Sequence, residues 1–158
     1  MLFKKFFVTS GVGLSRTSKL NAFDKALMEA GICQCNLVPV SSIIPEKAQH
    51  IPLKKIEPGS ITFTVLARID GEPGSSIAAG LGWALCTDEK GRDTYGIVVE
   101  DSSFGKKGDV KTNIALKLKE AVASRGMKIK SQHSKVVDVS KVPKDSYGSA
   151  IVALVYCP

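Results

Sequence analysis

The sequence is poor in the residues from which most metal, redox and nucleic-acid sites are built. Its two histidines, His50 and His133, are far apart, and its four cysteines include a C-x-C pair but no C-x-x-C motif. Because structural zinc and thioredoxin-like sites need closely spaced ligands, we expect no metal. Aromatic residues make up 6% and the basic residues form no arginine-rich run. The net charge of +7 therefore predicts a solvated lysine surface, and we expect no nucleic acid as partner.

Long apolar runs are also absent, which limits the compartments that the chain can occupy. No stretch approaches the ~20 residues that span a bilayer, and the segment 1–8 lacks an apolar region of signal-peptide length. We expect a cytoplasmic protein with no membrane partner. In a reducing compartment Cys33, Cys35, Cys86 and Cys157 are expected as free, buried or half-buried thiols, with Cys33 and Cys35 contributing packing.

The sequence does contain enough apolar residues for one compact domain. Of its 158 residues, 44% are hydrophobic and 23% are charged, and there is no linker or solenoid-length repeat. The patterning predicts the order β-α-β-β-β-β-α-β-β. The expected strands are 6–8, 32–40, 61–69, 77–86, 95–100, 128–139 and 148–156, and the expected helices are 20–30 and 110–123. We therefore predict a single α+β domain, 1–158, folded as a layered α/β sandwich with helices packed on mostly antiparallel sheets.

Individual residues mark where these elements begin and end. Ser18 is a candidate N-cap and Gly31 a candidate helix stop. Gly11 and Gly13 lack the third glycine of a dinucleotide-binding fingerprint and are predicted to lie in a plain loop. Pro39 predicts that strand 32–40 is an edge or irregular strand near its end. Connections are expected at 43–53, at 71–74 and around 143.

Two adjacent serines, Ser41 and Ser42, directly follow the predicted edge strand. A serine hydroxyl at a strained turn can attack the preceding carbonyl carbon and convert the amide into an ester. β-Elimination then cuts the chain and leaves dehydroalanine, which loses ammonia and becomes an N-terminal pyruvoyl group. Ser-Ser pairs are also common in ordinary turns, so this interpretation depends on the surrounding residues.

The surrounding residues support it through a resemblance that covers nearly the whole chain. The segment 20–32 reads Leu-Asn-Ala-Phe-Asp-x-Ala-Leu-x-x-Ala-Gly-Ile, 36–45 contains Asn-Leu and Val-Ser-Ser-Ile-x-Pro, and 96–100 reads Gly-Ile-Val-Val-Glu. This pattern resembles the pyruvoyl-dependent arginine decarboxylases. The resemblance implies decarboxylation of L-arginine to agmatine and CO2, in polyamine biosynthesis, by homotrimers with pockets between neighbouring protomers.

The same resemblance implies that the chain cleaves itself between Ser41 and Ser42. The β chain is then 1–41, and the α chain, 42–158, begins with a covalently bound pyruvoyl group made from Ser42, with no PLP and no metal. The ketone of such a group forms a Schiff base with the substrate amine and accepts the electron density that decarboxylation leaves. A proton donor must then protonate the substrate Cα before the amine is released.

Two residues match the family's catalytic and processing positions. Glu100 matches the proton donor, and burial beside Val98 and Val99 would raise its pKa so that it holds a proton; the alternative is a strand-end glutamate in solvent. Asn36 matches a position at the cleavage site, where its amide can bind the oxyanion formed in self-cleavage; the alternative is a turn asparagine. If the strand continues, Asp101 points to the opposite face from Glu100.

Three residues are candidate substrate contacts. Asp24 matches a position that lines the family's pocket, where a carboxylate can pair with a guanidinium at two points and select arginine over lysine. Leu20, about one helical turn away, is a candidate pocket wall, and Ser41 is a candidate contact once it is C-terminal. Asp24 alone would be read as a solvent-facing helix acid. Since a positive protein steers a cationic substrate poorly, Asp24 and Glu100 would have to make the pocket locally acidic.

The residues leave two alternative functions open. Another pyruvoyl-dependent amino-acid decarboxylase, such as one for histidine, would keep the serine pair and reshape the pocket, and Asp24 argues for arginine instead. A non-catalytic binding homologue would keep the fold and use its lysines on an anionic partner. The joint presence of Asn36, Ser42 and Glu100 argues against that homologue.

Overall fold

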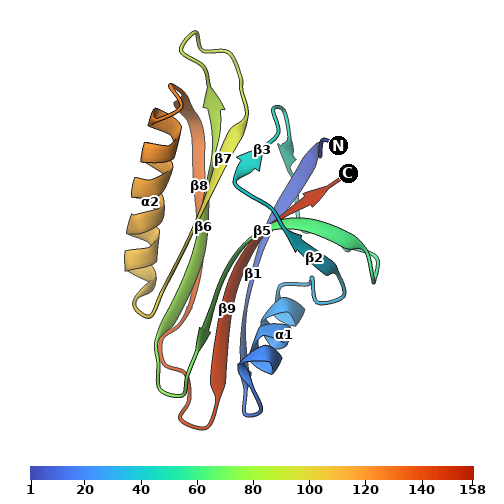
Figure 1. Ribbon diagram of the computed structural model, residues 1–158, viewed down its shortest axis with the longest axis vertical. Coiled ribbons are helices and arrows are strands. Elements are labelled where there is room, and N and C mark those ends of the chain that lie inside the picture. The colour runs from blue at the N-terminus through green and yellow to red at the C-terminus, as the bar shows by residue number, and fades with distance from the viewer.

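The structure is a computed structural model that describes residues 1–158. It contains nine strands and two helices, shown in Figure 1. In chain order these are β1 (Lys5–Ser15), α1 (Lys19–Glu29), β2 (Asn36–Pro39), β3 (Ile43–Ile44), β4 (Gln49–His50), β5 (Ile61–Gly71), β6 (Ile77–Thr87), β7 (Gly96–Ser103), α2 (Lys107–Ala123), β8 (Lys128–Val139) and β9 (Tyr147–Cys157). Both predicted helices and most of the predicted strands are therefore confirmed. The structure adds two very short strands, β3 and β4.

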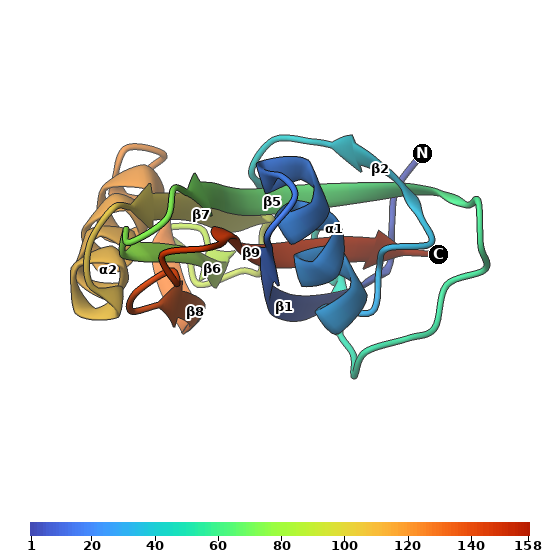
Figure 2. The same cartoon turned by 90° about the horizontal axis from the view of Figure 1, so that it is seen from below.

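The elements form four layers, helix, sheet, sheet and helix. Sheet A has the strand order β2-β5-β9-β1-β4, and sheet B has the order β3-β7-β6-β8. Only β1 with β4 and β2 with β5 pair in parallel. Figures 1 and 2 show α1 on the outer face of sheet A and α2 on the outer face of sheet B. The predicted α+β sandwich with mostly antiparallel sheets is confirmed.

The main core lies between the two sheets. Sixteen buried residues form it, among them Phe6, Leu81, Trp83, Val98 and Leu154. Strand β6 is buried on both of its faces. Its inter-sheet face carries the larger residues, and its other face, made of alanine and glycine, leaves room for α2. A buried strand of this kind lacks the alternation of polar and apolar residues that marks a surface strand.

Helix α1 has the predicted ends, and alanines form its fully buried face. The Ser18 hydroxyl accepts the Asn21 amide hydrogen at 3.1 Å and caps the helix, and Gly31 follows it with a φ of 74°. The fully buried positions are Ala22, Ala26 and Ala30, whereas Leu20 is 70% exposed. Phe23 and Leu27 pack half-buried against the same core. The small buried residues let the helix lie close to the sheet.

This close approach of helix and sheet also explains why the loop expected at Gly11 and Gly13 was wrong. These residues lie within β1, which runs unbroken from Lys5 to Ser15, and not in a loop. A Cβ at Gly11 would lie 2.0 Å from the Ala26 carbonyl oxygen, and one at Gly13 would lie 2.1 Å from the Ala22 oxygen. Glycine is needed here because the backbone of α1 packs directly onto the backbone of β1.

The segment between α1 and β5 differs most from the predictions. The strand expected at 32–40 is reduced to Asn36–Pro39, which is an edge strand of sheet A, as Pro39 indicated. The connection expected at 43–53 contains β3 and β4. Cys33 is exposed, not a packed thiol, whereas Cys86 and Cys157 are buried. Neither helix is long and apolar enough to cross a membrane.

Candidate active site

The Ser41–Ser42 bond lies where the chain passes from sheet A to sheet B. On one side, the Val40 amide donates to the Thr64 carbonyl of β5 at 2.9 Å, which continues the pairing of β2 in sheet A. On the other side, the Val98 amide of β7 donates to the Ser42 carbonyl at 2.8 Å in sheet B. Only Ser41 lies between these two attachments. The serine junction is therefore held by a different sheet at each end.

Ser42 continues the short antiparallel pairing of β3 with β7. Ile43 is paired with Ile97 and Ile44 with Gly96, so Ser42 lies opposite Val98. The reciprocal hydrogen bond, from the Ser42 amide to the Val98 carbonyl, is not formed. The ladder therefore ends at the amide that self-cleavage would break, and that amide is less constrained than the carbonyl beyond it.

Glu100 lies two residues beyond Val98 on β7. Side chains two residues apart on a strand share a face, and Val98 faces the inter-sheet core. Directly opposite residues also share a face, so Ser42 and Glu100 form a diagonal pair, for which a regular ladder puts the Cβ atoms about 7 Å apart. The register thus brings together two of the predicted catalytic residues, which are distant in sequence.

Glu100 is exposed in the single chain, as the alternative of a strand-end glutamate in solvent predicted. The protein still covers part of its carboxyl, and this desolvation raises its pKa, whereas the nearby Lys117 ammonium acts in the opposite direction. The Lys117 Nζ does not contact the Glu100 carboxylate; it donates to the Glu100 backbone carbonyl at 3.0 Å and to Asp101 Oδ1 at 2.6 Å. Asp101 therefore points toward α2, on the opposite face from Glu100, as predicted for a continuing strand.

One cavity adjoins Glu100, and another adjoins the serine junction. The first, a polar one of about 250 Å³, lies between β5, β7 and α2, and its lining includes Arg68, Glu100 and Lys117. The second, an apolar one of about 200 Å³, has Ser41 and Ile43 in its wall. Acidic and basic groups both face the first cavity, so within one chain it is not the purely acidic pocket that a cationic substrate would favour.

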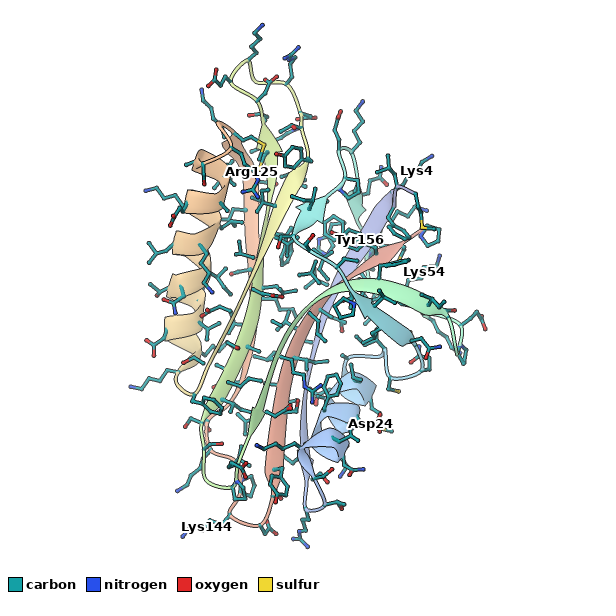
Figure 3. All side chains as sticks on the ribbon, viewed as in Figure 1. Lys4, Asp24, Lys54, Arg125, Lys144 and Tyr156 are labelled. Atoms are coloured by element: carbon teal, nitrogen blue, oxygen red, sulfur yellow. The ribbon has the colours of Figure 1, made fainter.

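The other predicted site residues are not brought to the junction within a single chain. Asn36 begins β2, and its side-chain amide donates to the Gly59 carbonyl at 2.8 Å. Ser41 follows it by five residue steps of extended chain, a distance of about 16 Å. Leu20 and Asp24 lie one turn apart on α1 and are both exposed. Figure 3 shows Asp24 on the outer side of α1, well away from Tyr156.

Three groups at the junction have no sign in the sequence. The Val98 amide is a backbone donor, so no residue type indicates it. The Tyr156 hydroxyl donates to the Ile43 carbonyl at 2.8 Å, and Lys117 joins α2 to the backbone of Glu100. Helical spacing would have found Lys117 only with knowledge of which face of α2 covers β7, and alternation along the last strand would have identified only the face that carries Tyr156.

The sequence of this chain is similar to those of known proteins over almost its whole length. The family model described as pyruvoyl-dependent arginine decarboxylase matches residues 5–158. A protein of that name from Methanothermobacter thermautotrophicus is 36% identical over 154 residues, covering 96% of this chain and 95% of the relative. One from Pyrococcus furiosus is 37% identical over 145 residues, covering 89% and 87%. One from Picrophilus torridus is 41% identical over 111 residues, covering 67% and 59%.

The sequence that forms this layered sandwich, with its serine pair between the two sheets, thus matches a family of enzymes. The chain belongs to the pyruvoyl-dependent arginine decarboxylase family, and the resemblance inferred from 20–32, 36–45 and 96–100 is confirmed. The family's name implies a pyruvoyl prosthetic group. The residues at the junction suit one, because Ser42 is the precursor type required and its carbonyl already has a backbone donor.

Proposed function

We propose that this protein cleaves itself between Ser41 and Ser42 and decarboxylates L-arginine to agmatine and CO2. One observation carries the proposal. The Ser41–Ser42 bond runs from sheet A to sheet B, and the register of β3 and β7 gives Ser42 and Glu100 a common face. Ser42, at the serine pair that matches the family pattern, therefore shares a face of sheet B with Glu100. Desolvation raises the pKa of this acid.

Self-cleavage begins when Ser42 Oγ attacks the Ser41 carbonyl carbon. The new C–O bond forms, the C–N bond breaks, and the Oγ proton passes to the nitrogen of residue 42. A base then removes the Cα proton of residue 42, and the Cβ–O bond breaks to release Ser41 as a carboxylate. The resulting dehydroalanine tautomerises to an imine, and water converts that imine to a ketone and ammonia.

The fold supports such a cut because the two products would stay paired. Segment 1–41 contributes β1, which is antiparallel to β9 along its whole length, and β2, which pairs with β5. Helix α1 also packs on β9 and β5. The core of sheet A thus consists of strands from both products, and each new end remains hydrogen-bonded to its own sheet.

In the processed protein, the pyruvoyl group would supply a ketone for a Schiff base with the substrate amine and an electron sink for decarboxylation. The Val98 amide would continue to donate to the carbonyl of residue 42. Glu100 would hold a proton on its carboxyl and deliver it to the substrate Cα. Lys117 would keep the Glu100 backbone in position, since it contacts its carbonyl and not its carboxylate.

We further propose that the working unit is a homotrimer in which a neighbouring protomer completes the pocket. Within one chain, Asn36, Asp24 and Leu20 are exposed and do not line the cavity that contains Glu100. Apolar residues near the junction are exposed as well: Val38 at 37%, Val40 at 36% and Ile43 at 43%. A neighbour covering these residues would bury them, and would allow Asp24 to bind the substrate guanidinium and Asn36 to act in processing.

Intact-mass analysis of the purified protein tests the processing step. We expect two chains, 1–41 and 42–158, the second beginning with a pyruvoyl group, and a single chain for Ser42→Ala. A wild-type protein that remains one chain after long incubation would contradict the proposal and favour the non-catalytic homologue. Gel filtration with light scattering tests the trimer, which a monomer at micromolar concentration would rule out.

Substrate choice and the proton donor need a second assay. CO2 release from arginine, lysine, ornithine and histidine should be greatest for arginine, whereas greatest release from histidine would favour the alternative decarboxylase. Glu100→Gln should still be cleaved but lose CO2 release by at least ~100-fold. Glu120→Gln is the matched control, because it makes the same change at an exposed side chain on α2. Normal turnover by Glu100→Gln would show that Glu100 is not the acid.

A further inference from the structure

The last inward-facing residue of sheet A reaches across the sandwich to the residue that follows Ser42. Tyr156 lies near the end of β9, and its hydroxyl donates to the Ile43 carbonyl of β3 at 2.8 Å. Tyr156 is 6% exposed. This hydrogen bond joins the two sheets beside the serine junction.

The register of β3 explains why this carbonyl is free to accept it. Ser42 lies opposite Val98 and receives its amide hydrogen, so the next residue, Ile43, occupies the alternate position of an antiparallel ladder. At that position the backbone groups point away from the partner strand. The Ile43 carbonyl therefore points away from β7, toward sheet A, where Tyr156 meets it.

The two hydrogen bonds hold successive peptide units from opposite sides. Val98 holds the carbonyl of residue 42 from sheet B, and Tyr156 holds the carbonyl of residue 43 from sheet A. Since β3 contains only two residues, its own pairing is short. The Tyr156 hydroxyl is therefore the second attachment point of the segment that would become the start of the α chain.

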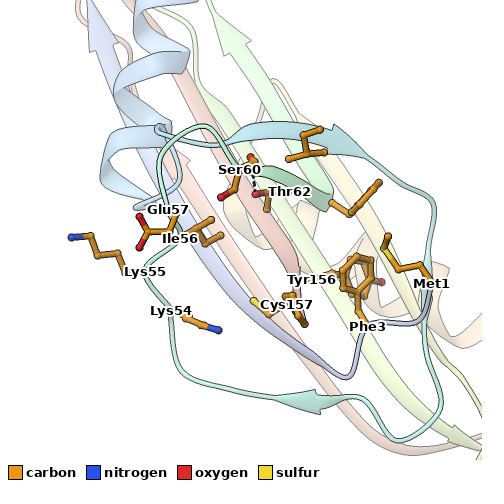
Figure 4. A pocket seen from close by; sticks show the side chains of 13 residues that line it. Met1, Phe3, Lys54, Lys55, Ile56, Glu57, Ser60, Thr62, Tyr156 and Cys157 are labelled. Carbon is orange, nitrogen blue, oxygen red and sulfur yellow. Dashed lines mark hydrogen bonds between the residues drawn. The ribbon is translucent and has the colours of Figure 1, made fainter.

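Packing fixes the Tyr156 ring and keeps its hydroxyl a donor. The Phe3 ring lies 5.7 Å from the Tyr156 ring and 5.4 Å from the Phe63 ring, measured between centroids. Figure 4 shows Phe3 and Tyr156 together in the wall of a larger apolar pocket of about 700 Å³. Burial raises the pKa of Tyr156 to about 12, so the hydroxyl stays protonated at neutral pH.

The Ser41 side of the junction is less confined. The Ser41 side chain is exposed, and Ser41 borders the apolar cavity of about 200 Å³ that also contacts Tyr156. Attack requires Ser42 Oγ and the Ser41 carbonyl carbon to come together, and rotation of the less confined Ser41 peptide can provide this approach. Such a rotation is productive only if residue 42 keeps its place while Ser41 moves.

From this geometry we propose that Tyr156 is a positioning residue for self-cleavage, which holds Ile43 so that Ser42 Oγ stays aligned with the Ser41 carbonyl carbon. The inference rests on the self-cleavage proposed above. Tyr156 transfers no proton and touches neither reacting atom. It acts before the ester forms, in the step that makes the Oγ–C bond and breaks the C–N bond.

The test is the rate of self-cleavage in freshly synthesised protein, followed by intact mass. Tyr156→Phe keeps the ring and removes the hydroxyl, and we expect cleavage about tenfold slower than wild type, the scale of one lost hydrogen bond. Tyr147→Phe is the matched control on the same strand, because its hydroxyl has no hydrogen-bond partner in the chain; it should cleave at the wild-type rate. Rates are taken well below the melting temperature of each variant, measured with Ser42→Ala added.

Hydroxylamine separates positioning from a later effect, because it cleaves an ester but not an amide. If Tyr156 positions the attack, hydroxylamine should not restore the cleavage rate of Tyr156→Phe. Restoration to the wild-type rate would overturn the inference, since the ester would then be forming normally. Equal rates for Tyr156→Phe and wild type would also overturn it and leave self-cleavage intact, whereas an uncleaved wild type would instead contradict the proposed function.

Discussion

The two helices cover their sheets in different ways, although both depend on strand glycines. Helix α1 lies so close to sheet A that its backbone meets the backbone of β1 at Gly11 and Gly13. Its buried positions are alanines, and the Thr9 hydroxyl of β1 donates to the Ala30 carbonyl at the helix end, at 2.8 Å. Backbone contacts and one polar bond therefore join this layer, together with the half-buried Phe23 and Leu27.

Helix α2 stands farther from sheet B and fills the space with branched side chains. Its buried residues are Val110, Ile114, Leu118 and Val122. Glycines in β6 receive them, and a Cβ at Gly82 would lie 2.2 Å from Ile114 Cγ2. The close contact here involves a side chain that can be replaced. The comparison teaches that the same residue type, glycine, serves a rigid interface in one layer and an adjustable one in the other.

The largest expected effect breaks the backbone interface. In Gly13→Ala, the new methyl would lie 2.1 Å from the Ala22 carbonyl oxygen and 2.6 Å from the Ala26 nitrogen. Because neither atom can rotate away, α1 must shift, and we expect the free energy of unfolding to fall by about 3 kcal/mol or more. Urea unfolding with Ser42→Ala added, which keeps one uncleaved chain, measures this loss.

Gly108→Ala is the control for that substitution. Gly108 lies in the first turn of α2, and a Cβ there meets nothing within 4 Å. Alanine should leave the stability unchanged or raise it by up to about 1 kcal/mol. A loss for Gly13→Ala no larger than 1 kcal/mol would contradict the close approach of α1 and β1.

The second effect sharpens the comparison at the side-chain interface. Gly82→Ala should cost about 1–3 kcal/mol through its clash with Ile114 Cγ2. Ile114→Leu removes that methyl group at nearly constant volume, so the double variant should lose at least about 0.5 kcal/mol less than the sum of the single losses. The same thermodynamic cycle by urea unfolding would show additive losses if Ile114 is not the obstacle. No side-chain replacement can provide an equivalent rescue for Gly13→Ala.

The third effect compares the two helix starts. Ser18 caps α1 with its side chain, whereas Lys106, the N-cap of α2, makes no side-chain capping bond. Ser18→Ala should cost about 1 kcal/mol, and Lys106→Ser should gain up to about 1 kcal/mol. Thermal unfolding of both variants with Ser42→Ala added checks this. A fall in stability for Lys106→Ser would show that the Lys106 side chain has another role.

The same contrast explains how far the sequence predicts the fold. Helix α2 was found because its large buried residues recur at helical spacing. In α1 the fully buried positions are alanines, whose pattern does not reveal the buried face, and Leu20 at the start of the predicted helix is exposed. Gly11 and Gly13 were read as a loop because a glycine's need for space depends on a helix that packs on it from elsewhere in the chain. β3 and β4 are two residues each, too short for any periodicity.

The candidate site was predictable only where residue types carry it. Ser41, Ser42 and Glu100 were named from the family pattern, and the register of β3 and β7 brings them near one another. The hydrogen bond from the Val98 amide to Ser42 depends on strand register, and the one from the Tyr156 hydroxyl to Ile43 depends on the distance between the sheets. No local sequence pattern encodes either. The roles of Asn36 and Asp24 stay predictions, because a single chain does not bring them to the junction.

The smallest expected effect lies where the two layers meet at the edge opposite the junction. There the His50 ring stacks on Phe6 at 5.2 Å and meets Trp83 edge-on at 5.5 Å, between centroids. His50 remains exposed on its other side. The desolvation that its packing causes, and to a lesser degree the nearby His133, lower the pKa of His50. The folded protein therefore binds fewer protons at this site than the unfolded chain does, so stability rises with pH.

This contribution is complete above the ordinary histidine pKa of about 6.5 and is lost progressively as the pH falls below it, down to the lowered folded value. His50→Phe keeps a ring against Phe6 but cannot take a proton. The raised pKa of Glu100 acts with the opposite sign. Its carboxyl binds a proton more readily in the folded protein than in the unfolded chain, so its contribution to the stability of the folded protein decreases as pH rises. The measurement is therefore the difference between wild type and His50→Phe, both with Ser42→Ala, in urea unfolding between pH 5 and 8. We expect the wild type to lose more stability on acidification, and parallel curves would show that the lowered pKa of His50 does not contribute to stability.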